Sequence, residues 1–124
     1  MAHLGTVGAD RRPHLVPVTF ALIGDRIVTA VDRKPKSTPD LRRIRNIADN
    51  PQVAVLCDHY EDDWTRLWWV RADGHARIVR ADGQRQEYLD ALATKYHQYR
   101  RQPPDGPVVV VTVHGWTGWT HAAA

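Results

Sequence analysis

Apolar and polar residues alternate along most of the chain, which is typical of β-strands whose two faces meet different surroundings. Pro17 lies inside one apolar run and favours an edge position or a bulge there, and Asp73-Gly74 interrupts another run in a way that suits a bulge or a turn. Gly24-Asp25 suits a tight turn, so the runs on either side of it are expected to form an antiparallel hairpin. The expected strands cover residues 4–7, 14–22, 26–32, 52–60, 67–79 and 108–113.

The apolar period lengthens in two places, which predicts helices. Thr38, Pro39 and Asp40 have the cap, proline and acid of a helix start, and Asn50-Pro51 marks its end. A second helix is expected over residues 84–96. About six strands, two helices and short connections predict one mainly β domain over residues 1–124: a small antiparallel barrel that helices plug or cap.

Composition narrows the class of protein. The 124 residues are 43% hydrophobic and 25% charged, which fits one globular domain. The single cysteine, Cys57, excludes an internal disulfide framework and favours a reducing, cytoplasmic compartment. We expect no membrane contact, because no apolar run is long enough to span a bilayer and no signal peptide is visible. A net charge of +3 argues against a nucleic-acid partner.

A basic, hydroxyl-rich segment at residues 33–38 separates the third expected strand from the first expected helix. Lys34, Lys36, Ser37 and Thr38 at a helix N-terminus could hold a phosphate, because backbone N–H groups point outward there. An exposed basic loop followed by an ordinary helix cap fits the same residues. The arginines at 42, 43 and 45 extend the positive charge, either as a groove for a polyanion or as a solvated helix face.

Other chemistry is not supported by the residue patterns. The acidic stretch over residues 58–63 lacks metal-ligand spacing, so no metal site is expected and an exposed turn is favoured. None of the seven histidines forms a nucleophile motif with Cys57 or a serine, and Cys57 suits a small core position. Trp68 and Trp69 are adjacent in a strand and must face opposite sides, so one packs in the core while the other calls for a planar ligand, another subunit or further packing.

Six segments, in this order, resemble the flavin and deazaflavin split-barrel family of pyridoxamine 5'-phosphate oxidase-like proteins. Within that family the sequence is most similar to the probable F420-dependent enzymes of actinobacteria. The segments are HLVPVTF (14–20), IVTAVD (27–32), KPKST (34–38), LRRIRNI (41–47), NPQVAVL (50–56) and LWWVR (67–71).

The resemblance implies a six-stranded antiparallel split β-barrel that works as a homodimer, with a cofactor in the groove between the subunits. It assigns the cofactor phosphate to Lys34, Lys36, Ser37 and Thr38. It places the cofactor ring along two strands, at Pro17, Val18 and Thr19 and at Thr29, Ala30 and Val31. Relatives usually carry glycine in the turn where this sequence has Arg11, so Arg11 is expected to need a positive φ.

The expected activity is hydride transfer from reduced coenzyme F420 to a small, unsaturated, electron-poor substrate. The cofactor carries the hydride, so no strong acid or base is required, and His59, Tyr60 and Tyr88 are only candidates for a proton donor. The basic helix could attract the oligoglutamate tail of F420, a part that FMN lacks. Two alternatives stay open: the same fold with FMN, and a non-enzymatic protein that carries the cofactor.

Overall fold

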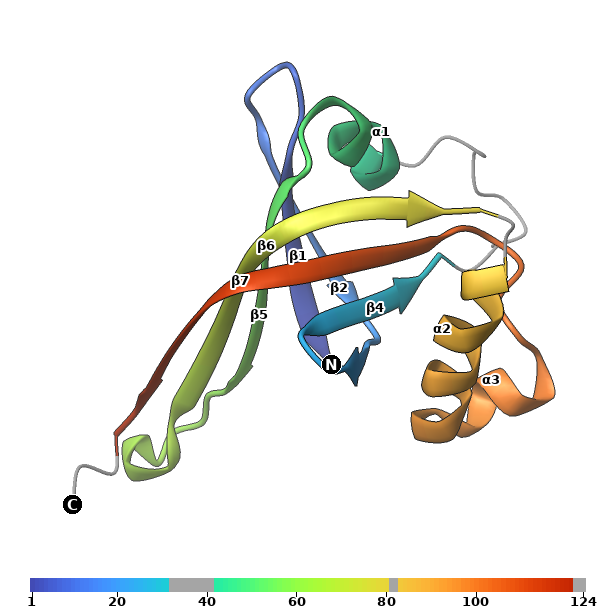
Figure 1. The fold of residues 1–124 in the computed structure, drawn as a ribbon. Coiled ribbons are helices and arrows are strands. Elements are labelled where there is room, and N and C mark those ends of the chain that lie inside the picture. The colour runs from blue at the N-terminus through green and yellow to red at the C-terminus, as the bar shows by residue number, and fades with distance from the viewer. Residues whose placement is uncertain (32–41, 81–82, 122–124) are drawn as a thin grey trace.

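Seven strands form one antiparallel sheet in the computed structural model, which describes residues 1–31, 42–80 and 83–121. The order across the sheet is β2-β1-β5-β6-β7-β4-β3 (Figure 1). The strands are β1 (Ala2–Val7), β2 (Pro13–Val18), β3 (Ala21–Ile23), β4 (Arg26–Ala30), β5 (Gln52–His59), β6 (Trp68–Val79) and β7 (Val108–Thr120). The helices are α1 (Arg42–Asp49), α2 (Gly83–Lys95) and α3 (His97–Arg101), with a short 3-10 helix, η1 (Trp64–Arg66).

The two edges of the sheet belong to consecutive strands. Only Thr19 and Phe20 separate β2 from β3, so the sheet must curl until its edges approach each other. No ladder joins β2 to β3 in the described part of the chain, and the barrel therefore stays open along this line. The mainly β, antiparallel split-barrel architecture is confirmed, but the sheet has seven strands where six were expected.

The extra strand arises because the expected strand over residues 14–22 is broken. The Phe20 N–H donates to the Tyr96 hydroxyl at 3.1 Å, and the Thr19 and Tyr99 hydroxyls lie 2.8 Å apart. These two residues therefore bond to the segment around α3 instead of continuing a strand. The expected hairpin is confirmed as β3 and β4, with Gly24 at φ +59° in its turn.

The last strand is longer than expected, and one helix was not expected. The strand predicted over residues 108–113 continues to Thr120, because β6 pairs with β7 along its whole length. The register shifts between Asp73 and Gly74, which confirms the predicted bulge, and the unpaired residue of β7 at this point is His114. The unexpected helix is α3, which has five residues.

Alternation along the strands divides the core into two clusters. Ile27 on β4 and Val31 directly after it point into the barrel, whereas Val28 and Ala30 on β4 point toward α2. The α2 side chains Tyr88 and Leu92 are fully buried against that outer face. Figure 1 shows α2 and α3 packed at one end of the sheet, so they cover only part of its outer face.

Helix α1 closes the barrel near the β1–β2 turn. Ile44 and Ile47 are buried in the barrel cluster, and the Asn46 amide donates to the Thr6 hydroxyl at 3.0 Å. The predicted helix start at residues 38–40 lies outside the described residues. None of the helices in the described part of the chain is both long and apolar enough to cross a membrane.

Candidate functional site

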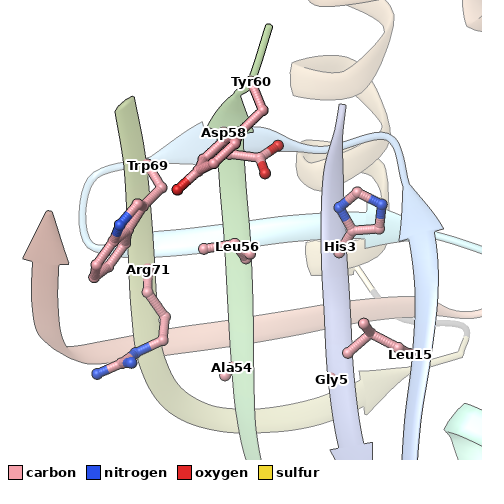
Figure 2. A pocket seen from close by; sticks show the side chains of 9 residues that line it. All are labelled: His3, Gly5, Leu15, Ala54, Leu56, Asp58, Tyr60, Trp69 and Arg71. Carbon is pink, nitrogen blue, oxygen red and sulfur yellow. The ribbon is translucent and has the colours of Figure 1, made fainter. Parts of the chain in front are cut away.

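The part of the sheet that α2 and α3 leave uncovered contains a hollow of about 480 Å³ (Figure 2). Four neighbouring strands, β2, β1, β5 and β6, supply its floor through residues on their outer face. The lining residues are His3, Gly5, Leu15, Ala54, Leu56, Asp58, Tyr60, Trp69 and Arg71.

The hollow combines an apolar floor with a few charged groups. Leu15 is 70% exposed, and the Trp69 side chain borders the hollow on β6. Asp58, Arg71 and His3 supply polar groups around this floor (Figure 2). A hollow of this kind suits a flat, partly apolar molecule with polar edges, or a complementary protein surface.

The prediction that Trp68 and Trp69 face opposite sides of their strand is confirmed in β6. Trp69 borders the hollow on the outer face, whereas Trp68 lies on the opposite face and is 39% exposed. The expectation that one of them packs in the core is wrong, because neither belongs to a core cluster. Trp116 and Trp119 on β7 are 54% and 42% exposed. In Figure 1 the β5, β6 and β7 strands extend beyond the barrel as a long ribbon, which leaves apolar side chains uncovered on both of its faces.

The residues assigned to the cofactor phosphate and ring are only partly visible. The phosphate residues Lys34, Lys36, Ser37 and Thr38 lie outside the described residues, so this assignment stays a prediction. Of the ring residues, Pro17 is exposed and Thr19 half-buried, and the other four are buried. The buried ones are Val18, Thr29, Ala30 and Val31.

The buried ring residues do not share one side-chain surface. Val18 and Val31 belong to the barrel cluster, whereas Ala30 belongs to the cluster under α2. A ring along these strands would therefore meet an exposed side chain at Pro17 and a half-buried one at Thr19. The Thr29 hydroxyl is buried without a hydrogen-bond partner among the described residues.

The basic face of α1 is partly neutralised. Arg42 forms an ion pair with Asp10 at 2.5 Å, and both line a depression of about 220 Å³ with Arg45. The backbone N–H of Arg12 bonds to the Asp10 carboxylate, and this bond together with the Arg42 charge lowers the pKa of Asp10. Arg11 in the same turn has φ +61°, as predicted for this position.

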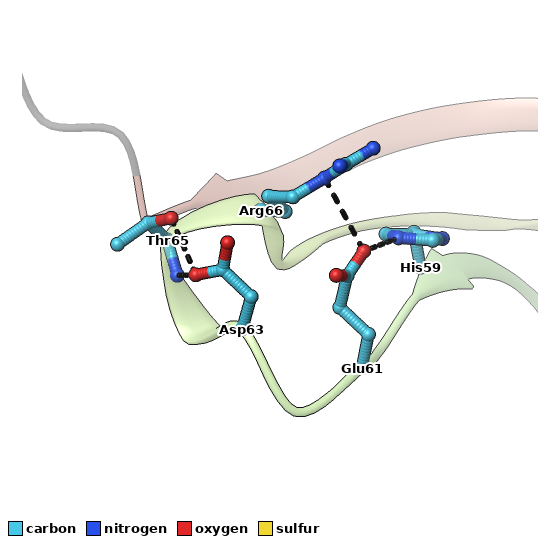
Figure 3. A network of polar contacts seen from close by, with 5 residues as sticks. All are labelled: His59, Glu61, Asp63, Thr65 and Arg66. Atoms are coloured by element: carbon cyan, nitrogen blue, oxygen red, sulfur yellow. Dashed lines mark hydrogen bonds and ion pairs between the residues drawn. The ribbon is translucent and has the colours of Figure 1, made fainter.

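The acidic stretch after β5 forms a local polar network (Figure 3). Glu61 bonds to His59 and pairs with Arg66 at 3.4 Å. Asp63 accepts hydrogen bonds from the backbone N–H and the hydroxyl of Thr65, which lower the pKa of Asp63. Within the described ranges, no three His, Cys, Asp or Glu side chains are grouped so that they could hold a metal ion.

The three candidate proton donors occupy different surroundings. His59 is held by Glu61 in the network, and Tyr88, a residue of α2, is fully buried against the sheet. Tyr60 is 62% exposed and lines the hollow, which makes it the best placed of the three.

Sequence reasoning did not single out the hollow. One signal was present: Leu15 and Leu56 are apolar residues on the face of their strands that alternates with the barrel core. These residues and the others that line the hollow become neighbours only through pairing of β2 with β1, of β1 with β5 and of β5 with β6.

The fold has several solved relatives, all with low sequence identity. A conserved hypothetical protein from Mycobacterium tuberculosis superposes with a TM-score of 0.76 and 21% identity, covering 98% of this chain and 77% of that one. The heme storage protein HutZ from Vibrio cholerae gives 0.75 and 17%, covering 96% and 84%. An FAD-binding protein from Mesorhizobium loti gives 0.69 and 15%, covering 94% and 83%.

These likenesses show a shared fold, and the family follows from the sequence itself. No curated protein matches the chain. The family of pyridoxamine 5'-phosphate oxidase matches residues 1–120, which is nearly the whole sequence. The chain therefore belongs to the pyridoxamine 5'-phosphate oxidase family.

Proposed function

We propose that this protein is a homodimeric oxidoreductase that uses reduced coenzyme F420 to transfer a hydride to a small unsaturated substrate. The observation that carries the proposal is the aromatic hollow on the uncovered sheet face of a chain that belongs to this family. Trp69 and Tyr60 offer flat aromatic surfaces, which suit a planar ring system.

A second copy of the chain is the partner that this surface fits best. The hollow is broad and shallow, and its Leu15 is mostly exposed in a single subunit. The ribbon also exposes Trp68 and Trp116 on one face and Trp119 on the other. Contiguous exposed apolar surface of this kind marks association sites, and a stable dimer buries about 800 Å² on each subunit. Dimerisation would turn the open hollow into a closed groove.

We assign different parts of the cofactor to different residues. Bound reduced F420 would supply the hydride, while the protein orients the ring and excludes water. Lys34, Lys36, Ser37 and Thr38 are proposed to hold the phosphate through charge-assisted hydrogen bonds. Arg42, Arg43 and Arg45 are proposed to attract the oligoglutamate tail through the positive charge that they place on and around α1.

FMN is the alternative cofactor, and cofactor storage is the alternative function. The FAD-binding relative from Mesorhizobium loti shares the fold and favours a flavin as the first alternative. The heme storage protein from Vibrio cholerae shares it as well, which favours keeping a carrier without catalysis as the second. Both alternatives retain the dimer and the groove.

Parallel titrations with F420 and FMN test the proposal, with tryptophan fluorescence as the readout. We expect saturable binding with F420 tighter than FMN, and a dimer by light scattering. Trp69→Leu should weaken binding of the cofactor, whereas Trp64→Leu, an exposed position outside the hollow, is the matched control.

The outcomes separate the candidates. Tighter FMN binding would replace F420 with a flavin, and tight binding without turnover on a broad substrate panel would favour a carrier. A monomer that binds neither cofactor would refute the proposal.

A further inference from the structure

Two arginines from different strands converge on one buried hydroxyl beside α2. Arg26 Nη1, from β4, donates to the Tyr88 hydroxyl oxygen at 3.2 Å, and Arg77 Nη2, from β6, donates to the same oxygen at 2.8 Å. Because both nitrogens contact one atom, they lie within about 6 Å of each other. The Tyr88 side chain is fully buried, so the position of its hydroxyl is fixed by packing.

This arrangement has an excess of positive charge and of donors. Within the described residues, neither guanidinium has a carboxylate at ion-pair distance, and the remaining bond of Arg77 is to the Gln84 side chain at 3.3 Å. The Tyr88 oxygen accepts both hydrogen bonds, and the described residues offer no acceptor for its own proton. Each guanidinium carries five N–H donors, and most of them have no hydrogen-bond partner among the described residues.

The neighbouring residues on the same sheet face add polar groups, of which the His75 Nε2 already bonds to the Gln52 side chain at 2.9 Å. Thr112 on β7 pairs with Arg26 on one side and with His75 on the other, so all three side chains point outward in one row. His114, at the bulge, places its ring 5.1 Å from that of His75. The acid on the same strand as His75, Asp73, is paired with Arg71.

We propose that Arg26, Arg77 and Tyr88 form a binding site for a phosphate group, with Thr112 and His75 at its rim. A doubly charged oxyanion would balance the two guanidiniums and accept N–H groups that Tyr88 does not use, while the buried Tyr88 hydroxyl holds both guanidiniums in place. The fork of N–H groups on each arginine matches the oxygen spacing of a phosphate. The site shares no residue with the hollow or with the segment proposed for the cofactor phosphate, so it is independent of the proposed function.

Isothermal titration of the full chain with inorganic phosphate at constant ionic strength tests the proposal. We expect saturable binding that falls about tenfold in Arg77→Gln, because a lost charge-assisted hydrogen bond is equivalent to about that factor. Arg26→Gln should weaken binding in the same way. Arg66→Gln, an exposed arginine paired with Glu61 at the far end of the ribbon, is the matched control and should bind as the wild type does.

Two further variants and a comparison with acetate complete the test. The double variant Lys34→Gln and Lys36→Gln should retain the binding, which separates this site from the proposed cofactor phosphate site. Tyr88→Phe keeps the buried ring and removes only the hydroxyl, so it should weaken binding in a protein that thermal unfolding shows to be folded. Absence of saturable binding, wild-type affinity for phosphate in both Arg77→Gln and Arg26→Gln, or acetate binding as tightly as phosphate would each overturn the proposal.

Discussion

The hydrogen bond between Thr6 and Asn46 joins strand β1 to helix α1 inside the barrel, and Thr6→Val tests its contribution. Thr6 is 1% exposed and Asn46 is 5% exposed, and the amide Nδ2 donates to the threonine hydroxyl at 3.0 Å. Valine has nearly the shape of threonine but offers no acceptor. The substitution therefore leaves a buried N–H without its partner while the packing stays almost unchanged.

The expected cost follows from the burial of this amide. A buried donor left unpaired costs about 1–3 kcal/mol. For a domain of this length, each kcal/mol lowers the melting temperature by about 4 °C, so a cost near 2 kcal/mol corresponds to about 8 °C. Because α1 follows the segment that we propose to hold the cofactor phosphate, a looser helix should also weaken cofactor binding.

Urea unfolding followed by circular dichroism measures the effect. The matched control is Thr117→Val on β7, an exposed threonine, which should change stability by less than about 0.5 kcal/mol. A double-mutant cycle with Asn46→Ala isolates the coupling, which we expect at about 0.5–1.5 kcal/mol. Equal stability of Thr6→Val and wild type, or strict additivity of the two substitutions, would refute the reasoning.

Three further predictions concern other parts of the fold. The backbone N–H of Arg12, together with Arg42, lowers the pKa of Asp10 below 3.8. This carboxylate therefore stabilises the fold above that pH and ceases to do so as the pH falls through the lowered pKa. Asp10→Asn should make the midpoint of urea unfolding less dependent on pH when it is measured between pH 2 and 5. Gly74→Ala should destabilise by about 1–3 kcal/mol, because its Cβ would lie 2.4 Å from a backbone oxygen of β7; an unchanged midpoint would show that the bulge can shift. Leu92→Ala should cost about 2–5 kcal/mol in thermal unfolding, because this fully buried side chain joins α2 to the sheet, and a loss below 1 kcal/mol would contradict that role.

Local patterns predicted the parts of the fold that are held by local interactions. The β3–β4 hairpin depends on a tight turn at Gly24, and the bulge depends on a glycine at 74, so both were visible in the sequence. The break at Thr19 and Phe20 was not, because it results from hydrogen bonds to Tyr96 and Tyr99, more than 70 positions further along the chain.

The end of β7 illustrates the same limit. The residues after Val113 are rich in glycine and threonine and resemble a loop, yet they form a strand. They do so because β6 offers a continuous ladder of backbone groups through to Thr120. Trp116 and Trp119 therefore lie within the last strand, whereas the sequence analysis ended that strand at residue 113.

The strand alternation, the helices α1 and α2, the turn at Gly24 and the family could be inferred from the sequence, because each is encoded in neighbouring residues or in their order. Which strands lie side by side depends on the folded sheet, and so do the hollow at Leu15 and Trp69 and the convergence of Arg26 and Arg77 on Tyr88. Both features combine side chains from strands far apart in the chain. Such combinations are fixed by sheet order and packing, which residue spacing does not reveal.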